Sequence, residues 1–499
     1  MGIAIGDRVD VGGHRGTVRF CGTVEGYSGE WAGIEWDEPS RGKHDGVVKG
    51  IRYFSTSNPT GGSLVRLNLV RGGEDLATEV EQRYSSDENN SIDALVLETD
   101  KGSVPIDNSY CVKAGRKVMQ LGRTHKIRNI VLDRMMVSFS SARDQPLFPY
   151  CTELNLFGNL LSRWSSVMEC LQQTPRCEEL LLSRNKMEAA NDVEALSNLP
   201  RSPLKRLILN YCGISENTIS CALCLFPQLQ ELFAARNSLH TFSLPPCPPP
   251  LTLVDIEFNP IGSIDNIVEL SRLKSLRKLS LASCGIPCVD FRGLEDANGN
   301  IGFENLEILN LKGNVIHDWP SIDELARLPS LRTLFIDYPH FKAEFGMDPR
   351  EIIIAKIAKL ENLERCELST VERRSAEIRF LNKYSALSAE RRTAERWEHD
   401  LQRLEKVHGP AVLDNAKSKQ LTIVKLVFVK DDKSLPPRPV PTTLSVAKLA
   451  DMARKLFALG RDDEISMHLD QSGHHMPLDN PIRQLAFYGP QNGDLIRVQ

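Results

Sequence analysis

The sequence predicts a multidomain protein in which a small all-β domain is followed by an α/β solenoid and then by an α+β domain. Three observations support this order. The first 72 or so residues are rich in glycine and short β-type runs, the middle repeats a leucine pattern, and the last 80 or so alternate strand patterns with one helix. A chain of 499 residues also exceeds what one hydrophobic core organises. We expect an all-β domain at 1–72, a linker and solenoid entry at 73–120, and the repeats at 121–370. A charged helical cap or linker at 371–417 and the final domain at 418–499 follow.

Composition narrows the class of protein. Apolar residues make up 41% and charged residues 25% of the chain, as in folded globular domains, and a net charge of −4 is too small to define a partner class. Any argument from charge must therefore be local. We expect neither a nucleic-acid nor a membrane partner. No apolar run reaches the length of a membrane helix, and Met1 to Asp10 lack a signal-peptide pattern, so we expect a cytoplasmic protein.

The middle of the chain repeats the pattern L-x-x-L-x-L-x-x-N-x-L, which is typical of leucine-rich repeats. The clearest copy contains Leu306, Leu309, Leu311, Asn314 and Ile316. Nine copies are found in all, and the residues that open their strands are Ile130, Leu154, Leu180, Leu207, Leu232, Val254, Leu279, Leu309 and Leu334.

Each repeat is expected to contribute one short strand whose L-x-L pair enters a shared core, while Asn or Cys turns the chain and bonds neighbouring backbones. Cys212 and Cys284 occupy that turn position, which favours a structural role. The only Cys-x-x-Cys pair, Cys221 and Cys224, lacks the further ligands of a zinc site, so we interpret it as two core thiols and expect no metal.

Residues between the two leucines of a repeat point outward on the concave sheet. Three adjacent repeats place Leu181, Ile208 and Phe233 there, where polar side chains are usual. Two interpretations stay open: an exposed apolar binding patch, or a surface that a linker or neighbouring side chains cover.

A highly charged stretch from about Val371 to Val407 follows the repeats and ends at Gly409-Pro410. Its composition favours an exposed, solvated helix that caps the solenoid and spaces the last domain.

The N-terminal domain contains a motif with fixed spacing. Trp31-Ala32-Gly33-Ile34-Glu35-Trp36 precedes Gly42-Lys43-His44-Asp45-Gly46, and Tyr53-Phe54 follow. This combination resembles the CAP-Gly domain. Between Arg41 and Arg71 the chain carries six bases and a single acid, which suits an acidic peptide with a terminal carboxylate.

The resemblance implies binding of acidic carboxyl-terminal tails such as the Glu-Glu-Tyr end of α-tubulin. Carried over by position, Trp31 walls the groove, Lys43 meets carboxylates and His44 hydrogen-bonds the peptide end. Leu64 stands where the family often has an aromatic residue. The remaining positions of the implied tail-binding site are Gly42, Asp45, Gly46 and Arg66. Trp36, Tyr53 and Phe54 are interpreted as core.

The C-terminal residues open with an apolar run from Leu421 to Val429, continue through a helix capped by Ser445, and end with a strand at Asp494 to Val498. The order strand, strand, helix, strand, strand is similar to the ubiquitin-like β-grasp. The chain ends at Val498-Gln499 without a diglycine, which favours protein docking over conjugation.

Taken together, a CAP-Gly domain, leucine-rich repeats and a ubiquitin-like end in this order resemble the tubulin-folding cofactor E family. The resemblance implies a chaperone that binds the tail and body of α-tubulin, cooperates with tubulin-binding cofactors B, C and D, and takes part in assembly or dissociation of the α/β-tubulin heterodimer. It implies a cytoplasmic, cytoskeleton-associated protein. The alternative is a microtubule-associated CAP-Gly adaptor that binds tubulin tails on polymer.

An enzymatic function is not expected. The sequence contains no His-Glu-x-x-His, Gly-x-Ser-x-Gly or Walker motif, so we predict no catalytic residues and no cofactor.

Overall fold

The computed structural model describes most of the chain as two compact units, one formed by Met1–Lys342 with Lys359–Cys366 and one by Ala343–Ala358 with Glu367–Gln499. The described residues are 2–85, 95–99, 102–106, 127–188, 196, 202–292, 295, 300–342, 346–386, 397–411, 423–431, 433–460, 465–471 and 474–498. Much of the predicted 73–120 linker therefore lies outside them. No helix in the described ranges combines the length and apolar character that a bilayer crossing requires.

The N-terminal residues form a four-stranded antiparallel sheet in the order β1-β2-β3-β6. Its core is made by the inward side chains of alternating strand residues, among them Val9, Val18 and Ile34, which are fully buried. The elements are β1 (Arg8–Val11), β2 (His14–Thr23), β3 (Glu30–Trp36), the 3-10 turns η1 (Pro39–Arg41) and η2 (Leu67–Leu69), the hairpin β4 (Val47–Val48) and β5 (Ile51–Arg52), and β6 (Gly62–Arg66).

A short connection leads from this sheet to the repeats. β7 (Glu74–Asp75) pairs in parallel with β11 (Val137–Phe139), and α1 (Leu76–Ser85) follows it. Arg15 in β2 donates to the carbonyl oxygens of Asn159 and Met135, both at 3.1 Å. The N-terminal sheet is therefore bonded to the first repeats within one unit. A further hairpin joins β8 (Leu95–Thr99) to β9 (Gly102–Ile106).

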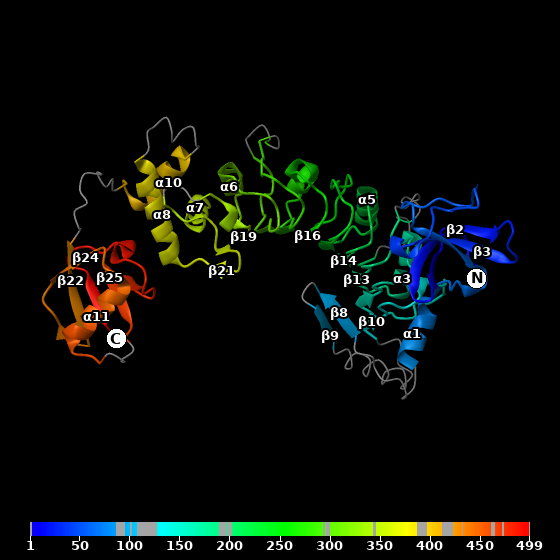
Figure 1. Ribbon diagram of the computed structural model, residues 1–499, viewed down its shortest axis with the longest axis horizontal. Helices are drawn as coiled ribbons and strands as arrows, with labels where there is room; N and C mark the ends of the chain where they lie inside the picture. Colours follow the sequence, from blue (N-terminus) through cyan, green and yellow to red (C-terminus); the bar gives the residue numbers. More distant parts are fainter. Residues whose placement is uncertain are drawn as a thin grey trace. The chain divides into compact units, whose positions relative to one another are not determined.

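The predicted solenoid is confirmed. Strands from nine successive repeats lie side by side in one parallel sheet, each residue in register with its counterpart in the next strand (Figure 1). They are β10 (Asn129–Val131), β12 (Glu153–Asn155), β13 (Glu179–Leu181), β14 (Arg206–Ile208), β15 (Glu231–Phe233), β16 (Leu253–Asp255), β17 (Lys278–Ser280), β18 (Ile308–Asn310) and β19 (Thr333–Phe335). The sheet continues into β20 (Asn362–Leu363), a strand that the repeat pattern did not reveal, and β21 (Cys366–Glu367) follows at the unit boundary.

The described helical elements between the repeat strands are α3 (Trp164–Gln173), α5 (Glu216–Leu225), η4 (Ile264–Arg272) and α6 (Trp319–Ala326), with the short turn η5 (Tyr338–His340). In α5, Ile219, Ala222 and Leu223 are buried, whereas Cys224 is exposed and Cys221 lies between these extremes. The interpretation of the pair as two core thiols was wrong, because Cys224 is exposed and Cys221 is only half-buried.

Asparagine side chains bond successive repeats together. Asn259, which is buried, accepts from the backbone N–H of Asn237 (3.0 Å) and of Leu239 (3.2 Å) in the preceding repeat. Its amide donates to the carbonyl oxygens of Ala234 (3.0 Å) and Ile256 (2.9 Å). These backbone groups are shielded from water, so each unmade bond would carry a desolvation cost.

The predicted turn role of Cys212 and Cys284 agrees with their contacts. The thiol of Cys212 donates to the carbonyl oxygen of Leu182, and that of Cys284 to Ile256, each at 3.3 Å. Burial raises the pKa of Cys212 to about 12 and that of Cys284 to about 11, so both remain neutral thiols at physiological pH.

Replacing Asn259 by alanine should destabilise the solenoid by about 2–4 kcal/mol, because four hydrogen bonds to backbone groups are lost at once and the N–H groups of Asn237 and Leu239 lose their acceptor. Differential scanning calorimetry of the full chain measures this as a lower midpoint of the solenoid transition. Asn305→Ala is the matched control, since the exposed Asn305 gives one side-chain bond among the described residues, to the Lys274 carbonyl oxygen. Equal midpoints for the two variants would contradict this role of Asn259.

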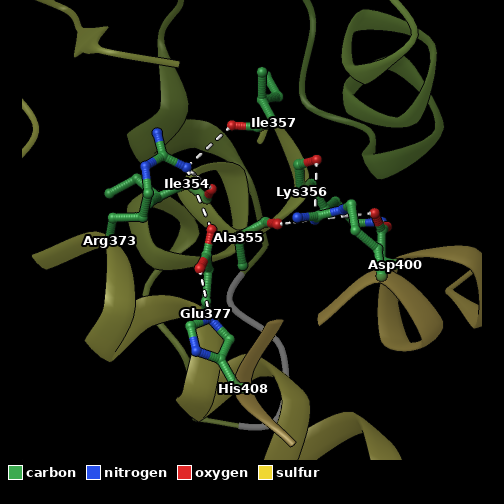
Figure 2. A network of polar contacts seen from close by, with 9 residues as sticks. Ile354, Ala355, Lys356, Ile357, Arg373, Glu377, Asp400 and His408 are labelled. Carbon is green, nitrogen blue, oxygen red and sulfur yellow. Dashed lines mark hydrogen bonds and ion pairs between the residues drawn. The ribbon is translucent and has the colours of Figure 1, made fainter. Parts of the chain in front are cut away.

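In the second unit, three helices enclose a buried polar network (Figure 2). They are α7 (Pro349–Lys356), α8 (Thr370–Ser385) and α10 (Glu398–His408). Lys356 is 2% exposed, and its ammonium lies 3.1 Å from a carboxylate oxygen of Asp400. Glu377 lies 2.7 Å from His408, and Arg373 donates to the Ile354 carbonyl oxygen at 3.2 Å, near the end of α7. The network therefore joins all three helices.

The expectation of one exposed, solvated helix after residue 371 was wrong. The stretch forms α8 and α10, and apolar residues at helical spacing, including Phe380, Tyr384 and Leu404, are fully buried. The high charge content concealed this pattern, because several of the charged side chains are themselves buried as partners of one another.

The C-terminal residues form the predicted β-grasp, with a mixed sheet in the order β23-β22-β27-β25-β26 and β24 also paired to β22. Its elements are β22 (Ile423–Lys430), β23 (Lys433–Ser434), β24 (Arg438–Pro441), α11 (Val446–Phe457), β25 (Met467–Gln471), β26 (His474–Pro477), the turn η6 (Leu485–Tyr488) and β27 (Leu495–Val498). Leu449 and Ala453 of α11 pack with Leu426, Phe428 and Ile496 of the sheet in one core.

Candidate functional site

A groove of about 450 Å³ opens on the N-terminal domain. Its lining combines aromatic and aliphatic side chains with the bases Arg41 and Lys43, and includes no carboxylate. The lining residues are Val24, Tyr27, Trp31, Trp36, Arg41, Lys43, His44, Val48, Ser63, Leu64 and Val65.

One wall of the groove is aromatic. Trp31, at the start of β3, meets Tyr27 edge to face with ring centroids 5.7 Å apart. The guanidinium of Arg66 lies 4.8 Å from the Trp31 ring centroid, and the ammonium of Lys49 lies 4.5 Å from that of Tyr27. The rings therefore present apolar surface and are accompanied by positive charge on their faces.

Gly42 and Gly46 let the loop between them approach other backbone. A Cβ on Gly42 would lie 2.0 Å from the carbonyl oxygen of Thr60, and one on Gly46 would lie 2.1 Å from that of Phe54. Gly46 also has φ +99°, a conformation that disfavours any side chain. Both glycines shape the loop, and neither lines the groove.

Lys43 and His44 reach the groove from this loop. The Lys43 side chain is exposed. Nδ1 of His44 accepts from the backbone N–H of Gly46 at 3.1 Å, which leaves the proton of the neutral ring on Nε2. Burial lowers the pKa of His44, with Asp45 opposing and Lys43 reinforcing this effect, so the ring is a neutral donor.

Of the other residues predicted for the tail-binding site, one lines the groove and two support it from outside. Leu64 lines the groove from β6, where it pairs with Gly33. Arg66 covers Trp31 from outside the lining and donates to the Ser28 carbonyl oxygen at 3.1 Å. Asp45 is bound to Arg52 at 2.8 Å, and this hydrogen bond lowers the pKa of Asp45. Asp45 therefore fixes the loop to the β4–β5 hairpin.

Sequence reasoning missed Tyr27 as part of this site, and it counted Arg41 and Lys49 among the bases of the segment without assigning them a place in the site. Trp36, predicted as core, is 4% exposed and bonds the Ser63 hydroxyl at 3.0 Å, yet its ring also contributes to the groove floor, with Arg41 4.7 Å from its centroid. The available clue was the aromatic residue four positions before Trp31 in a glycine-flanked loop. An aromatic wall beside unopposed bases can hold an acidic peptide with an apolar end.

Comparison with known proteins identifies the family. A family model of the CAP-Gly domain matches residues 5–70. The tubulin-specific chaperone E of Mus musculus is 30% identical over 534 residues, covering 99% of this chain and 98% of that protein. The chain belongs to the tubulin-specific chaperone E family. The Homo sapiens tubulin-specific chaperone E is 28% identical over 532 residues, with coverage of 99% and 98%. Among solved structures, the C-terminal ubiquitin-like domain of mouse tubulin-specific chaperone E is 20% identical, covers 17% of this chain and 91% of that one, and gives a TM-score of 0.15.

In this member of the tubulin-specific chaperone E family, the three outward residues of the concave sheet lie together. Leu181 pairs with Ile208, and Ile208 pairs with Phe233, in the register of β13, β14 and β15. All three are half-buried. We call them the concave apolar row; its binding role remains a prediction.

Asp255 borders the concave apolar row, in register with Phe233. Burial and the nearby charge of Glu257 raise the pKa of Asp255 to about 6, although its carboxylate accepts the Glu257 N–H at 3.1 Å. Ionised Asp255 is therefore held in an environment that favours its neutral form.

We expect Asp255→Asn to stabilise the solenoid by about 1–2 kcal/mol at pH 7.5, because the amide keeps the acceptor and removes the buried charge. A carboxyl whose folded pKa is raised weakens folding above that pKa, so the gain should shrink as the pH falls from 7 towards 4. Calorimetry across this range measures the difference, with the exposed Asp144→Asn as control. A gain that stays constant with pH would count against the assignment.

Proposed function

We propose that this chain is a non-catalytic tubulin chaperone whose CAP-Gly groove binds the acidic carboxyl-terminal tail of α-tubulin. The observation that carries the proposal is the groove itself, where Lys43 and Arg41 stand beside the Trp31 and Tyr27 rings and no carboxylate contributes to the lining. A tail of glutamates ending in tyrosine supplies matching negative charge and one apolar ring. The relatives' name, tubulin-specific chaperone E, supports tubulin as the client.

In this proposal the residues have separate tasks. Lys43 attracts the tail carboxylates, His44 donates through Nε2 to the peptide end, and Trp31 and Leu64 hold the last side chain, while Gly42, Asp45, Gly46 and Arg66 maintain the groove. The division into domains at 1–72, 121–370 and 418–499 separates tail binding from contacts with the tubulin body and with tubulin-binding cofactors B, C and D. We further propose a cytoplasmic, cytoskeleton-associated site of action and a part in assembly or dissociation of the α/β heterodimer.

Lys43→Ala should weaken binding of a peptide ending in Glu-Glu-Tyr by about tenfold, because a charge-assisted contact on the groove rim is lost. It should also flatten the salt dependence of binding. Fluorescence anisotropy with the labelled peptide measures both effects, and Lys43→Arg, which keeps the charge, is the matched control. If Lys43→Ala leaves the affinity for the peptide unchanged, tail binding at this groove is refuted. A separate co-sedimentation experiment compares microtubule polymer with soluble tubulin. Tighter capture of polymer would favour the alternative function, a microtubule-associated adaptor.

Phe233→Ala should reduce capture of tail-less tubulin at least severalfold and leave Glu-Glu-Tyr peptide binding intact, because truncating an interface aromatic commonly costs about 2 kcal/mol or more. Phe335→Ala is the matched control, since Phe335 holds the same strand position in β19, outside the concave apolar row. Melting temperatures measured in parallel separate a binding defect from a packing defect. Normal capture by a stably folded Phe233→Ala protein would exclude the concave apolar row as a contact with tubulin.

A further inference from the structure

One position at the turn of most repeats adopts a left-handed backbone, and from the second repeat onward it directly precedes the turn Asn or Cys. Six successive repeats carry Arg134, Gly158, Arg184, Tyr211, Arg236 and Phe258 there, with φ between +54° and +60°. Each backbone N–H in this row donates to a carbonyl oxygen of the next repeat, as Arg184 does to Asn210 at 2.9 Å. The six positions therefore form one line along the solenoid, which we call the turn row.

The backbone conformation of the turn row does not explain which residue types occupy it. Left-handed geometry favours glycine, and Gly158 and Gly313 occupy equivalent positions at φ +60° and +73°. In this conformation arginine, tyrosine and phenylalanine are less favourable than glycine, so they raise the free energy of the folded backbone at these positions. Their presence calls for a reason that lies in the side chains.

Arginines and aromatic rings alternate along the turn row. Arg184 lies 5.2 Å from the ring centroid of Tyr211, and Arg236 lies 5.4 Å from that ring and 3.8 Å from Phe258. At Gly158 the adjacent Phe157 supplies the ring, 6.0 Å from Arg134 and 5.8 Å from Arg184. The rings hold the guanidinium groups in place on an exposed surface.

The first two arginines carry unneutralised charge. Within the part of the chain that the structure describes, Arg134 and Arg184 are exposed and form no ion pair, whereas Arg206 on the neighbouring strand face is bound to both Glu179 and Glu231. A cavity of about 1030 Å³ opens beside them, and Lys186, Tyr211 and Arg71 also line it. This stretch of the turn row is preorganised for an anion.

We propose that the turn row is a second binding site, for an extended acidic peptide. Strands in a sheet are about 4.8 Å apart, so arginines two repeats apart are separated by about 10 Å. A peptide in the polyproline II conformation has three residues per turn and a rise of about 3.1 Å, which brings every third side chain to the same side at about 9 Å. A glutamate at every third residue thus meets Arg134 and then Arg184.

The surroundings favour a peptide over a nucleic acid. The turn row is one residue wide, and the strands beside it carry Glu153, Glu179, Glu231 and Asp255. The cavity lining also includes Asp10, Asp37, Glu74 and Glu79. A phosphate backbone with its bases is broader than this basic strip and would approach these carboxylates. A narrow peptide can avoid them.

This site goes beyond the proposed tail binding. Its residues do not overlap with the lining of the CAP-Gly groove, and it does not require a free carboxyl terminus. The two sites therefore differ in the peptides that they accept, which makes them experimentally separable.

The test uses the full chain and a fluorescent, C-terminally amidated peptide of repeated Glu-Pro-Ala, followed by anisotropy. We expect binding to be weakened roughly tenfold or more in Arg134→Gly/Arg184→Gly, since two charged contacts are lost. Glycine suits the left-handed backbone, so the melting temperature should change little. Arg176→Ala is the matched control, because Arg176 also covers an aromatic ring, Tyr150, at 5.2 Å but lies off the turn row. Excess Glu-Glu-Tyr peptide, which fills the CAP-Gly groove, should leave the probe bound.

Several results would overturn this proposal: no binding of the probe by the unmodified chain, equal binding by the double glycine variant, or displacement of the probe by the Glu-Glu-Tyr peptide. Displacement would assign the probe to the CAP-Gly groove and leave tail binding standing. If a single-stranded oligonucleotide binds more tightly than the probe through the same two arginines, the turn row is a nucleic-acid surface instead. Should the glycine variant unfold, Arg134→Gln/Arg184→Gln provides the same comparison.

Discussion

The hydrogen bonds of the turn asparagines are the interaction on which the solenoid depends. Asn185, Asn259 and Asn314 each accept from the preceding repeat and donate to carbonyl oxygens on both sides of the turn. They bring the backbones of neighbouring repeats to a fixed offset, and this offset aligns equivalent residues into straight rows. The concave apolar row and the turn row both exist because the asparagines hold the register of the repeats.

The sequence predicted the structure well at positions where local backbone geometry or repeat spacing requires one particular type of residue. The repeat strands follow from leucines at fixed spacing, and the loop around Gly42 and Gly46 follows from two glycines that no other residue can replace without a clash. Tyr27 and Arg41 were not found because they join the groove through tertiary packing. The turn row was not found because the arginines and rings that contact one another are about 25 residues apart in the sequence. In addition, the ring of the second repeat belongs to Phe157, one residue before the turn-row position at Gly158.

Charge was the least reliable guide to burial. The stretch from 371 to 407 looks solvated in the sequence, yet its Glu377 and Asp400 are buried. Asp400 is bonded to the buried Lys356 of α7, and Glu377 is bonded to Arg373 and His408. Burying such groups is tolerable only when each has a partner, and pairing depends on the packing of α7, α8 and α10. In the CAP-Gly groove the reverse holds: the bases have no acid beside them in the lining, so their charge is available to a ligand.

The two cysteine turns differ from the asparagine turns in the strength of their hydrogen bonds. The thiols of Cys212 and Cys284 donate to carbonyl oxygens of the preceding repeat, and the backbone N–H groups of Asn185 and Asn259 in that repeat reach the two sulfurs. Sulfur is a weaker donor and acceptor than the side-chain amide of a turn asparagine such as Asn237. The solenoid is thereby divided into blocks joined by weaker seams at these two repeats. In a linear array, where each repeat contacts only its neighbours, cooperativity is limited by the weakest junction. Under load or heating the blocks can therefore separate as units, with the concave apolar row crossing the first seam.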